Sequence, residues 1–221
     1  MPVILDNYKL ISKKAADKNA TLVVVTKTKP ISDVEELIAL GHKDFGENYV
    51  QELIDKEATL PKDIHWHFIG HLQSNKVKMI APFVYLIHGV DSLKLLQEIN
   101  KQATKINRVI PCLLQVHIAQ EETKFGFDFV ELKEALAELA NAPLSNVVIK
   151  GLMGMASFTE DKAVIRKEFE YLSSLYTKHK EKQGWDTLSM GMSSDYELAL
   201  EYGSTMLRVG SLILHGRAAV L

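Results

Sequence analysis

Short apolar runs alternate with amphipathic helical segments along this chain of 221 residues, and this alternation restricts the possible folds more than any other feature. The runs are rich in valine, isoleucine and leucine, as are strands buried on both faces of a parallel sheet. Eight are expected, at residues 22–25, 44–45, 64–69, 84–88, 110–118, 147–152, 187–190 and 206–209. Eight strand–helix units in about 200 residues predict an α/β fold, a single-domain (β/α)8 TIM barrel over residues 1–221. A doubly wound open sheet is the alternative.

Helical periodicity fills the segments between these runs. The clearest helices are expected at residues 91–106, 129–140, 161–179 and 194–202. Before the first strand, Ile4, Tyr8, Ile11 and Ala15 share one face of a further amphipathic helix. No Pro- or Gly-rich linker divides the chain, which supports one domain.

The composition disfavours several classes of function. Lysine and arginine number 26 against 28 aspartate and glutamate residues, so neither a nucleic acid nor an anionic membrane is expected as a partner. The first residues lack a basic segment followed by an apolar core, and no apolar run has the length of a membrane span. The single cysteine, Cys112, lies in an apolar run and is expected in the core. We expect a cytoplasmic monomer.

A barrel of this kind places its functional groups at the C-terminal ends of its strands. Lys27 lies where the first run ends, three residues before Pro30. At an apolar rim, partial loss of solvent favours the neutral amine, which can form a Schiff base with an aldehyde. Lys29 is the rival, but it directly precedes Pro30 and is expected in a solvated turn. The alternative for Lys27 is an ordinary surface lysine.

Two further clusters follow the second and seventh runs. Asn48 comes just after the second run and Gly46; an N-cap of the next helix is its simpler role, and a ligand contact is the other. After the seventh run, Ser194 and Glu197 have the spacing of a capping box, which predicts a helix start. Unpaired amides and the helix dipole would bind an anion there, and Gly191 would let the backbone approach it.

The eighth run carries Arg208 and is followed by Gly210 and Ser211. These two can offer an amide and a hydroxyl to the same anion, as barrels bind phosphate after strands seven and eight. A guanidinium in an apolar strand requires an acceptor, either a ligand or a buried carboxylate. Because strand eight adjoins strand one in a closed barrel, Arg208 is expected near Lys27. An amine for an aldehyde, a phosphate site and an arginine together match pyridoxal 5′-phosphate (PLP).

Two histidines and a set of methionines have weaker signals. His65 and His67 flank Trp66 at strand spacing and could point the same way, as metal ligands do. No third ligand stands out, so a solvated barrel rim is expected in place of a metal site. Methionines near strand ends are expected to pack in the core or a pocket, namely Met153, Met155, Met190, Met192 and Met206.

Seven segments along nearly the whole chain resemble the pyridoxal phosphate homeostasis protein family. They are residues 25–30, 45–52, 66–76, 124–126, 151–155, 188–195 and 208–211. The resemblance implies a barrel like the N-terminal domain of alanine racemase, of PLP fold type III, with PLP held as a Schiff base on Lys27. It also implies contacts to the cofactor from several other residues: Asn48, Met192, Arg208 at the pyridine nitrogen, and Ser193, Gly210 and Ser211 at the phosphate.

The resemblance implies a regulator of PLP supply that is not an enzyme, and we expect PLP-dependent apoenzymes as recipients. A PLP-dependent amino-acid racemase is the alternative, because Lys27 could serve one face of the substrate carbon and Tyr49 or Tyr196 the other. In alanine racemases that second group comes from an additional domain, for which we expect no room after the eighth strand. A barrel acting on a sugar phosphate without PLP is the third possibility.

Overall fold

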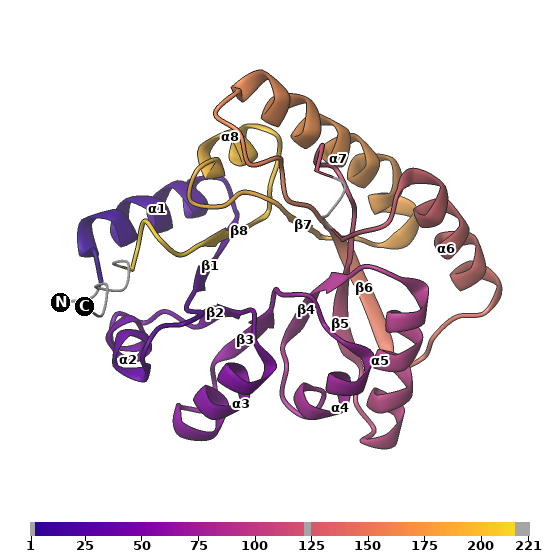
Figure 1. Ribbon diagram of the computed structural model, residues 1–221, viewed down its shortest axis with the longest axis horizontal. Helices are drawn as coiled ribbons and strands as arrows, with labels where there is room; N and C mark the ends of the chain where they lie inside the picture. The colour runs from indigo at the N-terminus through magenta and orange to yellow at the C-terminus, as the bar shows by residue number, and fades with distance from the viewer. Residues whose placement is uncertain (1–2, 122–124, 215–221) are drawn as a thin grey trace.

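A ring of parallel strands surrounded by helices forms the fold (Figure 1). The structure is a computed structural model and describes residues 3–121 and 125–214. Its elements are α1 (Leu5–Asp17), β1 (Thr21–Val25), α2 (Ile31–Ala39), β2 (Asp44–Glu47), α3 (Val50–Thr59), β3 (His65–Phe68), the 3₁₀ helix η1 (Ser74–Lys76), α4 (Val77–Ile80), β4 (Leu86–Val90), α5 (Leu93–Lys105), β5 (Ile110–Gln115), α6 (Phe129–Asn141), β6 (Val147–Met153), α7 (Lys162–Gln183), β7 (Thr187–Ser189), α8 (Tyr196–Glu201) and β8 (Met206–Val209).

The strands pair in sequence order, and β8 closes the barrel against β1. Each of the eight predicted runs overlaps one of these strands. Closure confirms the predicted (β/α)8 barrel and excludes the doubly wound open sheet. Because all strands run in one direction, their carboxyl ends lie on one face of the ring.

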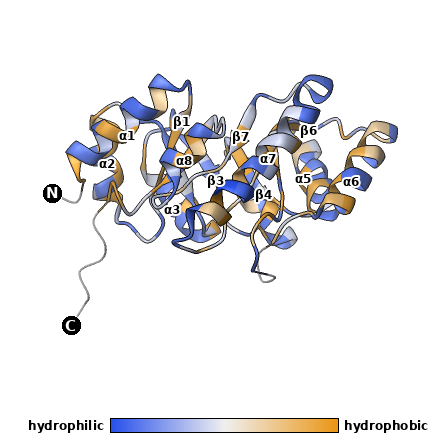
Figure 2. Cartoon of the chain, turned by 90° about the horizontal axis from the view of Figure 1, so that it is seen from above, coloured by the Kyte–Doolittle hydropathy of each residue, from blue (hydrophilic) through white to orange (hydrophobic). Residues whose placement is uncertain are grey.

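The helices cover the outside of the ring with their apolar sides. Figure 2 shows apolar and polar colour alternating along most helices, as expected for helices half in contact with a core. In α1 the buried residues are Ile11 and Ala15, both on the face that the spacing predicted. Within residues 3–121 and 125–214, no helix is both long enough and apolar enough to cross a bilayer.

Apolar side chains also fill the inside of the barrel. Val23, Leu86, Leu113, Met153 and Met206 form a buried cluster there, separate from the layer between strands and helices. Met155 packs against this inner cluster and Met190 belongs to the outer layer, so these methionines pack as predicted. Cys112 is also buried as expected, and burial raises the pKa of its thiol.

Candidate functional site

The residues predicted to bind a ligand lie at the carboxyl ends of four strands. They are Lys27 after β1, Asn48 after β2, Met192 and Ser193 after β7, and Arg208, Gly210 and Ser211 in or directly after β8. In the register of β1 and β8, Val23 pairs with Arg208 and Val24 with Val209. The barrel therefore brings the arginine and the lysine to the same sector, as expected from closure.

Lys27 is exposed, so the predicted partial burial of its side chain at the strand end is not found. The reason is that β1 stops at Val25, and the lysine lies in the following turn. The backbone of that turn is nevertheless fixed. Thr28 has φ of 61°, in the left-handed region that β-branched residues seldom adopt. The amide of Lys29 donates to the carbonyl oxygen of Thr26 at 3.0 Å, which closes the turn.

A buried ion cluster holds the backbone of this turn in place. The Lys56 side chain is 5% exposed, and its Nζ donates to the carbonyl oxygen of Thr26 at 2.7 Å and to Glu47 Oε1 at 2.6 Å. Thr26 Oγ1 donates to the same Glu47 oxygen at 2.6 Å. Glu52 Oε2 accepts the backbone N–H of Thr28 at 2.7 Å. Both neighbours of the candidate lysine are thus held by side chains of β2 and α3.

The cluster is expensive to bury. Burial raises the pKa of Glu47, and its contacts with Lys56 and Thr26 offset this only in part. Glu47 Oε2 is also buried without a hydrogen-bond partner among the described residues. Buried ion pairs seldom stabilise a fold more than well-packed apolar residues would. The main effect of this cluster is therefore to fix the geometry of the turn. Sequence analysis missed Lys56, because a lysine in an amphipathic helix has the pattern of a surface residue.

Two of the predicted phosphate ligands meet. The amide of Gly210 donates to Ser193 Oγ across 3.4 Å, a long bond that places the two groups side by side. A Cβ added at residue 210 would lie 3.0 Å from the carbonyl oxygen of Val25, so glycine suits this close approach of β8 to β1. Ser211 follows directly and is exposed. An amide and a hydroxyl that converge in this way can both donate to one phosphate.

The predicted capping box at Ser194 is wrong. Helix α8 begins at Tyr196, and Asp195 occupies the N-cap position without a side-chain cap bond. The Asp195 carboxylate instead accepts the backbone N–H of Met192 at 2.6 Å, within the loop itself. One of the loop amides expected to face an anion is therefore engaged by a carboxylate. The candidate anion site narrows to Ser193 and the residues after β8.

The N-cap role favoured for Asn48 is also wrong. The N-cap of α3 is Tyr49, whose side chain makes no cap bond. Asn48 is half-buried, and its backbone lies so close to Gly70 that a Cβ there would be 2.4 Å from the Asn48 carbonyl oxygen. Helix α3 begins one residue later than an N-cap at Asn48 would require, and a ligand contact by Asn48 stays a prediction.

Arg208 extends into the barrel and is 4% exposed. Its Nη1 donates to Ser189 Oγ at 2.6 Å and its Nη2 to the carbonyl oxygen of Gly154 at 3.1 Å. Across the described ranges no carboxylate forms an ion pair with it, so the alternative of a buried pair with a core carboxylate is not found. Burial lowers the pKa of Arg208 to about 10, an effect that the charge of Asp195 offsets in part. The guanidinium therefore remains a cation at neutral pH.

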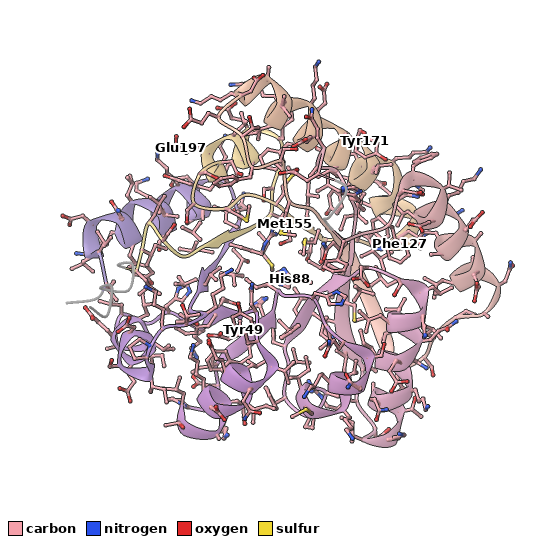
Figure 3. All side chains as sticks on the ribbon, viewed as in Figure 1. Tyr49, His88, Phe127, Met155, Tyr171 and Glu197 are labelled. Carbon is pink, nitrogen blue, oxygen red and sulfur yellow. The ribbon has the colours of Figure 1, made fainter. Side chains whose placement is uncertain are left out.

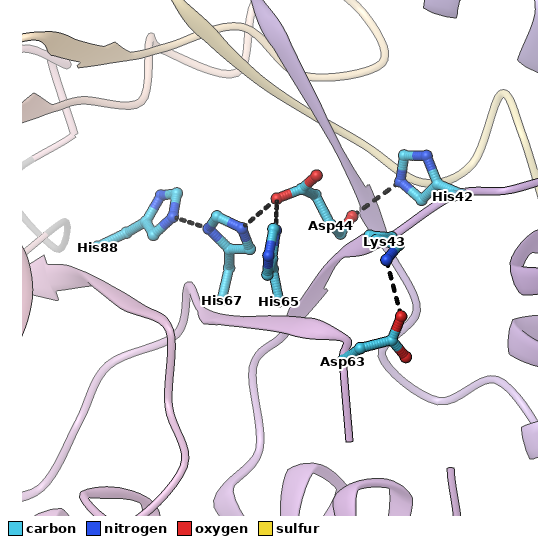
Figure 4. A network of polar contacts seen from close by, with 7 residues as sticks. All are labelled: His42, Lys43, Asp44, Asp63, His65, His67 and His88. Atoms are coloured by element: carbon cyan, nitrogen blue, oxygen red, sulfur yellow. Dashed lines mark hydrogen bonds and ion pairs between the residues drawn. The ribbon is translucent and has the colours of Figure 1, made fainter. Parts of the chain in front are cut away.

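His65, His67 and His88 form a network of polar contacts with Asp44 (Figure 4). His65 Nδ1 and His67 Nε2 both contact Asp44 Oδ1, at 3.0 and 3.1 Å, so the two rings do point the same way. His67 Nδ1 contacts His88 Nε2 at 3.0 Å, and His88 Nδ1 contacts Ser189 Oγ at 3.1 Å. His67 is fully buried, which contradicts the solvated rim expected for it, because its strand position faces the interior.

Burial also sets the charge of these rings. It lowers the pKa of His67, although the hydrogen bond to Asp44 offsets part of the effect. It lowers the pKa of His88 well below the usual value, and the nearby His67 and Arg208 act in the same direction. Both rings are neutral at pH 7. No group of three potential metal ligands exists in the part of the chain that the structure describes.

A mostly apolar cavity adjoins the candidate site. It has a volume of about 500 Å³ and lies between the loops after β6 and β7, lined by Met155, Phe158 and Met192 among others. Figure 3 shows Met155 and His88 near the middle of the ring, whereas Tyr171 and Glu197 lie on the outer helices. Lys124, within a segment that resembles the family, lies outside the described residues.

Comparisons with known proteins give the chain a family. Residues 3–217 match the family described as alanine racemase, N-terminal domain. A pyridoxal phosphate homeostasis protein of Pasteurella multocida is 34% identical over 92% of this chain and 89% of its own length. One of Pseudomonas aeruginosa is 40% identical over 89% of this chain and 84% of its own. The structure of PipY of Synechococcus elongatus with PLP bound is 33% identical, with a TM-score of 0.83 over 93% of this chain and 98% of that one. The chain belongs to the pyridoxal phosphate homeostasis protein family.

Proposed function

We propose that this protein binds PLP at the carboxyl face of its barrel and serves PLP homeostasis. One observation carries the proposal: an exposed lysine amine, the Ser193–Gly210 pair and the buried Arg208 cation occupy neighbouring strand ends. These are the groups that an aldehyde, a phosphate and a pyridine nitrogen require. PipY, a relative of the same family, has been solved with PLP bound, which supports the same ligand here.

Each group has a role in this proposal. When bound, PLP supplies an aldehyde and an electron-withdrawing ring. The Lys27 amine would hold the aldehyde carbon as a Schiff base, with the release of one water. Ser193, Gly210 and Ser211 donate hydrogen bonds to the phosphate, while Asn48 and Met192 flank the cofactor. Arg208 has five N–H donors, of which two are used by Ser189 and Gly154, and a remaining donor would bind the ring nitrogen.

This arrangement favours a carrier over the racemase alternative. An arginine only donates hydrogen bonds, so it leaves the ring nitrogen unprotonated and the ring a weaker electron sink. Of the two tyrosines considered for the second face, Tyr196 donates its hydroxyl to Glu197 at 3.3 Å, and its ring lies beneath the ammonium of Lys14 in α1. Tyr49 is 54% exposed. We propose that the protein holds PLP and passes it to PLP-dependent apoenzymes, for which an exposed Lys27 is suited.

An absorption titration tests the proposal. PLP added to the purified protein should give the band of a protonated Schiff base, shifted from that of free PLP. Lys27→Ala should abolish the band, whereas the matched variant Lys29→Ala should keep it. A wild-type protein that binds inorganic phosphate but gives no band would favour the sugar-phosphate alternative.

Isotope exchange separates the carrier from the racemase. The PLP-loaded protein, given a panel of L-amino acids in deuterated water, should catalyse little exchange at Cα. Rapid exchange with loss of chirality, abolished in Lys27→Ala, would instead identify a single-domain racemase.

A further inference from the structure

A continuous chain of hydrogen bonds crosses the inside of the barrel and ends at Arg208. It starts at Asp44, the first residue of β2, and passes through His67 of β3 and His88 of β4 to Ser189, the last residue of β7. The last bond joins Ser189 Oγ to Arg208 Nη1. Three of the four bonds connect side chains on neighbouring strands, and the fourth, between His88 and Ser189, crosses the barrel from β4 to β7. The barrel itself therefore fixes their order.

Only one arrangement of protons satisfies the whole chain. Arg208 can only donate and an ionised Asp44 can only accept, while Ser189 and each neutral histidine bring a single proton. Four protons must therefore serve four bonds in one direction. Ser189 donates to His88 Nδ1, His88 Nε2–H donates to His67 Nδ1, and His67 Nε2–H donates to Asp44. Any other tautomer leaves one bond with two protons and another with none.

The surroundings of the chain keep it isolated from bulk water. The barrel interior also holds the buried apolar cluster of Val23, Leu86, Leu113, Met153 and Met206. His67, His88 and Ser189 are fully buried. Asp44 is the partly open end, with its side chain 24% exposed, and the hydrogen bonds from His67 and His65 lower the pKa of that carboxyl although burial opposes them.

Few other ionisable groups face the chain. Around His67 they are Asp44, His65, His42, His88 and the ring of Tyr85, whose centroid is 5.3 Å away. Around His88 they are His67 and Arg208. Around Arg208 the facing charge is that of Asp195. A proton added to the chain thus enters an interior that already holds the arginine cation.

We propose that His67 and His88 are positioning residues, which hold Ser189 and through it the guanidinium of Arg208 in the orientation that meets the cofactor ring. The inference rests on the proposed function, since it assigns the cofactor to the free donors of Arg208.

Proton uptake at His67 releases this arrangement. A proton on His67 Nδ1 makes that ring a donor on both sides. His88 must then carry its own proton on Nδ1 and donate to Ser189, which accepts from two donors and loses its fixed hydroxyl direction. A proton taken up at His67 thereby acts on the arginine through the neutral ring of His88 and the hydroxyl of Ser189.

Nuclear magnetic resonance of the ¹⁵N-labelled histidine rings, without added PLP, tests the chain itself. At pH 7.5, His67 and His88 should both be neutral with the proton on Nε2, and acidification below pH 6.5 should move both rings together. The variant Asp44→Asn, which removes the counterion of a protonated His67, should lower the pH of this change. At pH 7.5 an Nδ1–H tautomer on either ring would overturn the inference, and so would two rings that titrate independently on acidification.

PLP affinity tests the positioning role. His88→Leu breaks the chain and should weaken PLP binding about tenfold, the loss expected for one hydrogen bond to a charged group. His88→Gln, whose amide both donates and accepts, should restore part of the affinity. The control His65→Gln removes the other partner of Asp44 and should leave affinity and tautomers unchanged. Equal PLP affinity in wild type and His88→Leu would refute this inference alone, whereas a wild type that binds no PLP would refute the proposed function.

Discussion

The turn that carries Lys27 and the interior that carries Arg208 are both held by buried polar groups, but in opposite ways. The turn is clamped by charges: the ammonium of Lys56 and the carboxylates of Glu47 and Glu52 fix the backbone on either side of the lysine. The interior chain holds a side chain, and its middle consists of neutral rings and a hydroxyl. The clamp fixes the backbone position from which the Lys27 side chain extends. The interior chain fixes the orientation of the Arg208 guanidinium.

The difference follows from what each residue has to do. In the proposed function Lys27 needs a mobile side chain to form and release a covalent bond, and in the structure only the backbone around it is anchored. In the same proposal Arg208 is a fixed donor; it is buried, and its acceptor Ser189 is itself held by a hydrogen bond. Charges can be paired over a short distance, as in the clamp, but a path across a low-dielectric barrel is less costly when its members are neutral.

The largest effect is expected from a variant that breaks the clamp formed by Lys56, Glu47 and Glu52. Lys56→Met leaves Glu47 buried without its cation, which should reduce the free energy of unfolding by about 3–5 kcal/mol. The control Lys43→Met removes an exposed pair with Asp63, whose side chains are 55% and 67% exposed, and should reduce it by about 1 kcal/mol or less. Urea denaturation measures both. Similar small losses in the two variants would mean that the clamp is not a stabilising unit.

The next effect concerns ligand binding at the Ser193–Gly210 pair. Changing Ser193 and Ser211 together to alanine removes hydroxyl donors, and a hydrogen bond to a charged group contributes about 1.5–3 kcal/mol. The PLP dissociation constant should rise by at least roughly tenfold, while the thermal transition of the PLP-free protein stays near that of wild type. An unchanged affinity, measured by fluorescence titration, would assign the phosphate to backbone groups or to another place.

The smallest effect is a pH dependence of the free energy of unfolding. The neutral histidines of the interior and the charged clamp contribute to it with opposite signs. His67 and His88 have folded-state pKa values below the unfolded value near 6.5, so above that pH they add no dependence. As pH falls below 6.5, His67 and His88 become protonated in the unfolded chain but stay neutral in the folded chain. The free energy of unfolding should then fall by up to about 1.4 kcal/mol per pH unit for each ring.

The raised pKa of Glu47 acts in the opposite direction at lower pH, where the folded chain is the one that gains protons. Denaturant curves between pH 7.5 and 5.5 check the histidine contribution. His88→Gln should show a shallower decline than wild type. A decline that is equally steep in this variant would place the titrating group elsewhere.

Much of this fold could be predicted because its signal is local. Most strands contain a short apolar run, and Lys27, Arg208 and Gly210 were predicted from their places relative to those runs, whereas Ser193 was predicted from the family resemblance. The clamp and the interior chain could not be predicted from the sequence, because they depend on strand register. His67 and His88 are 21 residues apart in sequence and meet only because β3 and β4 are neighbours. The predicted capping box was wrong although Ser194 and Glu197 have the right spacing. The helix begins after Asp195, whose carboxylate accepts an amide hydrogen bond within its own loop.

The most direct test of the account is the site of covalent attachment. Borohydride reduction of the PLP-loaded protein, followed by peptide mapping, should place the pyridoxyl group on Lys27. Its exposed amine lies on a turn held at both sides, whereas Lys56 is committed to Thr26 and Glu47. An adduct on Lys27 alone, lost in Lys27→Ala and kept in Lys29→Ala, is the predicted result. A principal adduct on Lys29, or on any other lysine, would contradict the assignment on which the proposed site depends.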